Sequence, residues 1–183
     1  MKKSNLLIIC VLAIALLAMP VSAYTHYFYL FNHGTMARTE GGEGEGPINT
    51  GISSVHNYGW GHRTVLNAGS LATPTRAWVD LPVTGVASYD GTHPLVRYAH
   101  IQMRSETNNG GIVRVDVYNG HTKVKQLDVD WYSSPYAEWE EFTVDLGGYY
   151  DFQRGMNMDV WINNVWNEPR YNEIGGYGAK AEW

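Results

Sequence analysis

The sequence predicts an all-β fold, an antiparallel β-sandwich of the jelly-roll kind. Apolar residues alternate with polar ones over much of the chain instead of recurring every three or four positions. Glycine, asparagine and proline residues interrupt these runs about every 8–12 residues, as in sandwiches built from short strands. No convincing helix is expected beyond the first 23 residues.

The first 23 residues have the pattern of a secretory signal peptide. Two lysines form a charged start, an apolar run covers residues 6–17, and small residues fill positions 21–23. The apolar run is shorter than the about 20 residues that a membrane-spanning helix needs. We therefore expect cleavage after Ala23, one exported domain over residues 24–183, and a secreted or cell-envelope location without membrane insertion.

Removal of this signal changes the composition of the domain. It takes away the only cysteine, Cys10, and with Lys2 and Lys3 shifts the formal charge from −5 to −7. All 7 Trp, 13 Tyr and 4 Phe remain, so a disulfide-free domain has large aromatic side chains for its core. No basic cluster stands out, which argues against nucleic acid and anionic membranes as partners.

The first half of the mature chain contains short strand candidates separated by loops. Residues 24–31 form an aromatic strand candidate, which Asn32-His33-Gly34 ends. Residues 40–46 contain only Glu and Gly, so they are expected to form a loop. A strand is expected to open at Gly59-Trp60-Gly61 and to run to Leu66, and another covers residues 78–81.

From residue 95 onward the alternation becomes regular. Asn119-Gly120 between two alternating runs is a strong signal of a tight hairpin. Residues 107–111 have the composition of another turn, and an aromatic turn is expected after Gly147-Gly148. The strands expected in this half are 95–106, 112–118, 123–131, 139–146, 156–162 and 174–183.

Each regular strand can be divided into an apolar and a polar-aromatic face. In one of them Ile112 is out of phase with the apolar Val113, Val115 and Val117. The polar-aromatic set contains almost no lysine, which a face built only for solubility would favour. Aromatic rings stack on the C–H face of a sugar, while fixed polar groups pair with its hydroxyls. The predicted ligand-binding residues are Tyr98, Arg104, Arg114, Asp116, Tyr118, Asp159 and Trp161.

This pattern favours an exported, non-catalytic β-sandwich that binds a carbohydrate or similar polar polymer through a sheet face. Two alternatives stay open. The same residues can be ordinary sheet surface, with arginines and aspartates paired across strands. A structural or envelope-associated protein can also use such a face for self-assembly or for protein partners.

No cofactor is expected from the sequence, although calcium stays open as a ligand. Zinc is less favoured, because the histidines of the first half lack compact ligand spacing; they are His26, His33, His56 and His62. Hard oxygen ligands suit weak extracellular calcium sites. The candidates are Glu43, Glu45, Asp128, Asp130 and Asp151.

A glycoside hydrolase is the enzyme alternative, and it needs two carboxylates about 5–10 Å apart. Glu138 and Glu140 fall on one face of a predicted strand. The run Pro94-Leu95-Val96-Arg97-Tyr98 resembles a segment of small jelly-roll xylanases, in which a nucleophilic Glu follows Pro-Leu-Val. Arg97 occupies that position here, so the sequence argues against an enzyme.

Three segments, His33-Gly34, Gly59-Trp60-Gly61 and residues 113–120, together resemble a family of small, functionally uncharacterised all-β proteins from prokaryotes. This resemblance implies a β-sandwich and no catalytic residues. Residues 95–165 are also similar in general pattern to jelly-roll carbohydrate-binding modules. That likeness concerns architecture, and a fold does not determine a function.

Overall fold

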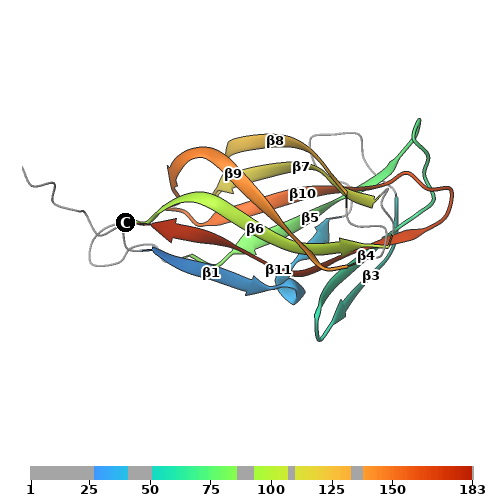
Figure 1. The fold of residues 1–183 in the computed structure, drawn as a ribbon, viewed down its shortest axis with the longest axis horizontal. Coiled ribbons are helices and arrows are strands. Elements are labelled where there is room, and N and C mark those ends of the chain that lie inside the picture. Colours follow the sequence, from blue (N-terminus) through green and yellow to red (C-terminus); the bar gives the residue numbers. More distant parts are fainter. Residues whose placement is uncertain (1–26, 41–50, 86–92, 107–109, 133–137, 183) are drawn as a thin grey trace, which may run out of the picture.

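The computed structural model describes residues 27–40, 51–85, 93–106, 110–132 and 138–182. They form two antiparallel sheets packed face to face, which confirms the predicted β-sandwich (Figure 1). The helical part of these residues is a single 3-10 turn, η1 (Gly34–Met36). None of the described segments is a helix long and apolar enough to cross a membrane. The predicted signal peptide lies outside the described residues.

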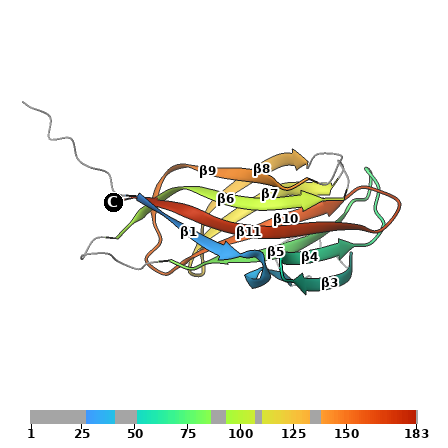
Figure 2. The same cartoon turned by 60° about the horizontal axis from the view of Figure 1, so that its bottom comes forward.

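Sheet A has six strands. Its longest strand, β11, pairs with both β4 and β1 along the same side. The strands are β1 (Tyr27–His33), β3 (Ile52–Tyr58), β4 (Gly61–Leu66), β6 (Leu95–Ser105), β9 (Glu140–Asp151) and β11 (Arg170–Glu182). Their order is β3-β4-β11-β6-β9. Within β11, residues 170–174 pair with β4 and residues 176–182 pair with β1, which lies beside β11 in Figure 2.

Sheet B has five strands and forms the other layer. They are β2 (Arg38–Glu40), β5 (Thr75–Val83), β7 (Gly110–Asn119), β8 (Thr122–Tyr132) and β10 (Met156–Asn164). Their order is β2-β5-β10-β7-β8. Asn119-Gly120 forms the predicted hairpin between β7 and β8, with Gly120 at a φ of 59°.

The core lies between the two sheets and is built from the apolar faces of the regular strands. Ile101 and Met103 of β6 have no accessible surface, and neither has Met158 of β10. Tyr177 of β11 is also fully buried, and burial raises the pKa of its hydroxyl. The alternation read from the sequence therefore places the correct residues inside.

Two expectations about strand irregularities are wrong. Ile112 shares the core with Val115 and Val117, because the register between β7 and β10 shifts there and makes Val113 the extra residue of a β-bulge opposite Trp161 and Ile162. The aromatic turn expected after residue 148 does not exist, since β9 continues to Asp151. The chain instead bulges opposite β6, with Gly147 at a φ of 74°.

Two short strands were not expected from the sequence. β2 has three residues, and β3 is an edge strand whose side chains are mostly exposed and polar. Neither offers the period-two apolar pattern by which strands are recognised. The β1 strand continues through Asn32 to His33, where the sequence was expected to end it, and residues 24–26 lie outside the described part of the chain.

The buried face of β6 gives a direct test of the core. We expect Ile101→Ala to lower the free energy of unfolding by about 2–5 kcal/mol, because it leaves a cavity between the sheets. The control is Leu71→Ala, since Leu71 is 87% exposed and its loss should change stability by less than about 0.5 kcal/mol. Urea unfolding measures both, and equal effects would contradict the assigned core.

Candidate functional site

The seven residues predicted to bind ligand lie on two opposite outer faces of the sandwich. Tyr98 and Arg104 belong to β6 and face outward from sheet A. The other five face outward from sheet B; they are Arg114, Asp116, Tyr118, Asp159 and Trp161. Alternation identifies the outer residues of each strand, but it does not tell which sheet the strand joins. The seven residues therefore do not form one site.

The outer face of sheet B is organised around a pair of stacked tryptophans. The rings of Trp78 and Trp161 lie 5.2 Å apart and are nearly parallel. The guanidinium of Arg76 lies 4.5 Å from the Trp161 ring centre, and that of Arg114 lies 5.3 Å from the Trp78 ring centre. Much of the ring surface is thus in contact with neighbours within the protein.

Asp116 binds the cations beside this stack. It accepts hydrogen bonds from Arg114 Nε at 2.7 Å and from Lys123 Nζ at 3.2 Å. The hydrogen bond to Asp116 raises the pKa of Arg114. Arg114 and Asp116 lie two residues apart on β7, while Lys123 reaches Asp116 from β8. The ordinary-surface alternative expected arginines and aspartates to pair across strands; here they pair along one strand, and Arg114 and Asp116 already satisfy each other.

The outer face of sheet A contains a recess of about 290 Å³ beside β1. One wall is made by Tyr29 and Phe31, which are 61% and 65% exposed. The opposite wall is made by His100 of β6 and Glu141 of β9, whose Nδ1 and Oε1 atoms lie 2.9 Å apart. The Tyr29 ring meets the His100 ring at 6.3 Å between centres, so exposed aromatic rings and a hydrogen-bonding pair line the same hollow.

Glycines of β11 allow β1 to lie close to this recess. A Cβ at Gly178 would collide with the carbonyl oxygen of Leu30, and one at Gly176 would lie 2.6 Å from Cε1 of Phe31. Any other residue at these positions would require β1 or its rings to move. The absence of side chains at these positions of β11 therefore lets β1 and the Phe31 ring lie directly against the strand.

A second aromatic group lies on the same face, and we call it the platform. It consists of Tyr58, Trp60, Arg63, Arg104, Trp139 and Tyr171. Tyr58 and Trp60 stack with ring centres 4.9 Å apart, and Trp60 meets Trp139 edge-on at 5.7 Å. Arg63 lies 4.4 Å from the Tyr171 ring centre, while Arg104 lies 4.7 Å from that of Trp139.

The buried carboxylate of Glu173 binds both arginines of the platform. Glu173 is fully buried and accepts hydrogen bonds from Nε of both Arg63 and Arg104, the former at 2.6 Å. Burial lowers the pKa of Arg63, but the hydrogen bond and charge of Glu173 outweigh this effect and raise it overall. The platform is therefore a pair of guanidiniums fixed by one carboxylate and covered by aromatic rings.

The structure separates the histidines considered for zinc. His62 is buried and uses both ring nitrogens, towards Thr39 at 2.7 Å and Asn57 at 2.7 Å. Burial lowers its pKa. His33 contacts Thr35, whereas His56 packs against Tyr58. His26 lies outside the described residues.

Within the described ranges, no group of three or more His, Cys, Asp or Glu side chains could hold a metal ion. Two calcium candidates, Glu43 and Glu45, lie outside these ranges, and so does the side chain of Asp130. Calcium binding therefore stays a prediction.

The position that would supply a xylanase nucleophile is part of a surface ion pair. Arg97 Nε and Nη2 lie 3.2 and 3.3 Å from the two carboxylate oxygens of Asp145. The hydrogen bond from Arg97 lowers the pKa of Asp145. Of the two other carboxylates considered, Glu138 is exposed ahead of β9 and Glu140 lies opposite Met103.

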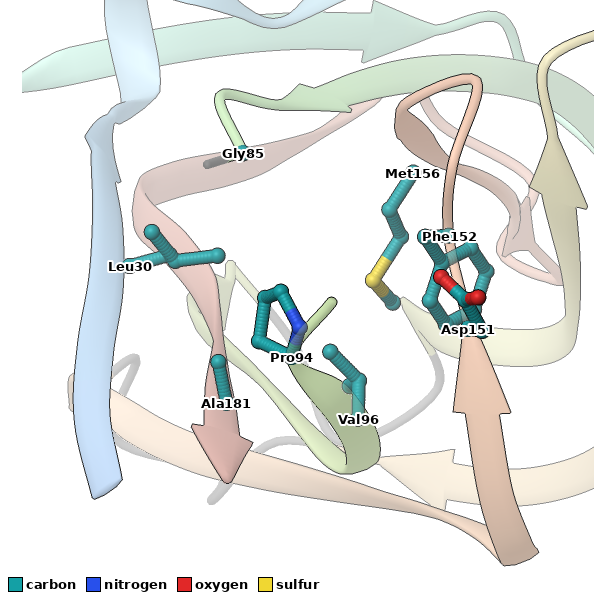
Figure 3. A pocket seen from close by; sticks show the side chains of 8 residues that line it. All are labelled: Leu30, Gly85, Pro94, Val96, Asp151, Phe152, Met156 and Ala181. Carbon is teal, nitrogen blue, oxygen red and sulfur yellow. The ribbon is translucent and has the colours of Figure 1, made fainter. Parts of the chain in front are cut away.

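A small cavity lies at one end of the sandwich, between the sheets (Figure 3). It is lined mainly by apolar groups, among them Leu30, Val96, Phe152 and Met156. Its volume of about 20 Å³ leaves room for about one water molecule. It is too small to hold a sugar unit, so the open recess on sheet A is the better ligand site.

No protein-family model matches the chain, and no curated protein matches it. The resemblance to a family of uncharacterised prokaryotic proteins therefore stays a prediction.

Several solved structures are similar to the chain at low identity. A family 61 carbohydrate-binding module in complex with β-1,4-galactotriose is 8% identical over 86% of this chain and 88% of that chain, with a TM-score of 0.41. A family 29 module from Piromyces equi is 12% identical over 87% and 91%, with a TM-score of 0.34. A family 35 module from Paenibacillus barcinonensis is 14% identical over 84% and 97%, with a TM-score of 0.35. At TM-scores below 0.5, what those proteins bind does not transfer to this chain.

The sequence did not identify most of the residues that line the recess and the platform on sheet A. Tyr29 and Phe31 were assigned to a strand, but their faces were not separated because Phe28 and Leu30 between them are apolar as well. Trp60 and Trp139 adjoin turns, where alternation gives no information. The available signal was Gly175-Gly176 inside a strand, which often marks a close approach of other groups to the backbone.

The platform depends on its buried carboxylate. We expect Glu173→Gln to lower the free energy of unfolding by about 3 kcal/mol, because two guanidiniums lose their only described carboxylate partner. Glu141→Gln is the matched control, since Glu141 is exposed and its pair with His100 should contribute less than about 1 kcal/mol. Chemical unfolding measures both changes. A loss for Glu173→Gln no larger than that for Glu141→Gln would contradict the role of Glu173.

Proposed function

We propose that this chain is an exported, non-catalytic β-sandwich that binds a carbohydrate on the outer face of sheet A. The observation that carries the proposal is the recess between the exposed rings of Tyr29 and Phe31 and the hydrogen-bonded pair His100–Glu141. It presents an aromatic surface and polar groups to the same volume. This is the combination that a sugar ring requires.

The two walls of the recess have complementary roles. The rings of Tyr29 and Phe31 can cover the apolar C–H face of a sugar unit. Glu141 accepts hydrogen bonds from hydroxyls, and Thr143 lies 3.4 Å from His100 at the same wall.

The charges on this face support a neutral ligand. Arg63 and Arg104 share the carboxylate of Glu173, and Lys180 pairs with Glu182 at 2.7 Å. The hydrogen bond from Lys180 lowers the pKa of Glu182, so that pair stays ionised. A polyanion would meet cations that already have carboxylate partners, while a neutral sugar needs no free charge.

The binding proposal can be tested with polysaccharide pull-down and a glycan array on the mature chain. We expect the native protein to retain at least one neutral polysaccharide, and Tyr29→Ala combined with Phe31→Ala to weaken that binding at least tenfold, or about 1.4 kcal/mol. Both side chains are exposed, so the fold should survive the change.

Trp161→Ala is the control on the opposite sheet, and we expect it to leave the binding unchanged. Loss of binding with Trp161→Ala alone would move the ligand to sheet B, where five of the residues predicted from the sequence lie. Absence of any bound glycan would overturn the function itself.

One observation favours self-assembly as a second candidate function. β1 pairs only with β11 among the described strands, and Tyr27, Tyr29 and Phe31 on it are 60–65% exposed. An edge strand with exposed rings can add a strand from a second chain. Light scattering decides between the candidates, because growth of the mass with protein concentration, abolished by Tyr29→Ala, would favour assembly.

Export is supported by the signal pattern over residues 1–23. When the full chain is expressed with its own leader, we expect the protein outside the cytoplasm to begin at Tyr24. Amino-terminal sequencing of that protein measures this directly. A protein that keeps Met1 and stays in the cytoplasm would contradict export, whatever its sugar binding.

A further inference from the structure

We infer that the recess and the platform form one continuous site, which binds an internal stretch of a neutral polysaccharide chain rather than a single terminal sugar. This inference rests on the proposed function and concerns the length and charge of the ligand. It follows from the way that two neighbouring glycines of β11 connect the two groups of rings.

The connection is a β-bulge at the centre of sheet A. The register between β11 and β6 shifts between Ile174 and Gly176, so Gly175 is an extra residue in β11. Side chains at consecutive positions of a regular strand would point to opposite faces. At the bulge, Gly175 and Gly176 instead both meet rings that lie on the outer face of the sheet.

Each of these glycines has a ring from a different group resting on it. A Cβ at Gly176 would lie 2.6 Å from Cε1 of Phe31, which belongs to the recess. A Cβ at Gly175 would lie 2.9 Å from Cζ3 of Trp139, which belongs to the platform. The two groups therefore meet on adjacent residues of one strand.

From Trp139 the row of rings continues to the edge of the sheet. Trp139 meets Trp60 at 5.7 Å, and Trp60 stacks on Tyr58 at 4.9 Å. Trp60 lies in the turn between β3 and β4, while Trp139 precedes β9. Three separate parts of the chain thus contribute rings to a row that runs from β1 past Trp139 to β3, and both of these strands lie on the same side of β11.

A row of this length offers more than one sugar unit can cover. One sugar ring stacks on one or two aromatic rings, whereas the row has exposed rings at both ends, Tyr29 and Phe31 at the recess and Tyr58 at β3, with the partly buried Trp139 and Trp60 between them. Several linked units can therefore bind at once, and each added unit raises the affinity without a further loss of overall translational freedom.

Polar groups accompany the row from one end to the other. His100 and Glu141 lie at the recess, and the exposed Gln102 lies next to Gly175. Arg104 follows beside Trp139. Because Glu173 binds both Arg104 and Arg63, the platform carries one net positive charge from three ionised groups, and Glu141 at the recess offsets it. Neutral chains are therefore favoured over uronic acid chains.

Titration calorimetry with a ladder of neutral oligosaccharides tests this inference. The ladder runs from one to six units and is made from a polysaccharide that the native protein retains. We expect the affinity to rise at least tenfold from the shortest binding member to the hexamer. A carboxylated ladder of the same lengths should bind at least tenfold more weakly.

Variants at the bulge identify the cause of the length dependence. Trp139→Ala should flatten the rise while binding of the shortest ligand persists, and Gly175→Ala should act in the same way because its Cβ displaces the Trp139 ring. Gly85→Ala is the matched control, since a Cβ there meets no atom within 4 Å. Trp139→Phe keeps a ring and should keep most of the rise, which guards against a loss of fold in Trp139→Ala.

The outcomes separate this inference from the proposed function. Equal affinity for short and long ligands, or a rise that Trp139→Ala leaves intact, would overturn the continuous site while sugar binding at the recess stands. Preference for the carboxylated ladder would overturn the assignment of a neutral ligand. Failure of the native protein to bind any saccharide would overturn the function on which the inference rests.

Discussion

Close approach to the backbone of β11 is the constraint on which sheet A depends. Gly176 and Gly178 let β1 and its rings lie against the strand, and Gly175 does the same for Trp139. A single added methyl group at Gly178 would meet the backbone of β1, which is held by its own ladder to β11. Glycine normally weakens a strand because it adds no packing and loses more chain entropy. Here that cost is offset by aromatic side chains that cover the bare backbone.

The second constraint is electrostatic and lies next to the first along the same strand. Glu173 has no contact with solvent, so its charge needs partners within the protein. Arg63 and Arg104 come from β4 and β6, the two strands that flank this part of β11. The guanidinium of each one also contacts aromatic rings of the platform. The buried carboxylate thus fixes the positions of rings on three neighbouring segments. The platform is ordered from its base, independently of any ligand.

The sequence was informative where one strand could be considered alone. Alternation placed Ile101, Met103 and Met158 in the core, and Asn119-Gly120 identified the β7–β8 hairpin. It failed where the answer depends on pairing between distant strands. The bulges at Val113 and Gly147 are properties of two strands together, as is the assignment of Arg104 to one sheet and Arg114 to the other. The residues that were expected to share a face were divided between two faces for this reason.

The same limit explains why the recess and the platform could not be predicted. Phe31 and Trp139 are 108 positions apart in the sequence, and only the bulge in β11 brings their rings to adjacent residues. No local pattern encodes that meeting. The pair Gly175-Gly176 showed that something approaches the backbone there, but it did not show which side chains do so.

The pairing of β11 also has a consequence for the order in which the protein can fold. β1, β4 and β6 all depend on this strand for their hydrogen bonds, and it is the last of the described strands to leave the ribosome. Sheet A therefore cannot form until β11 is available, because β11 is its central strand. Pairing of distant segments is a slow step in the folding of β proteins, so the late arrival of β11 delays closure of the sandwich, and for a chain exported as we propose such a delay is compatible with translocation.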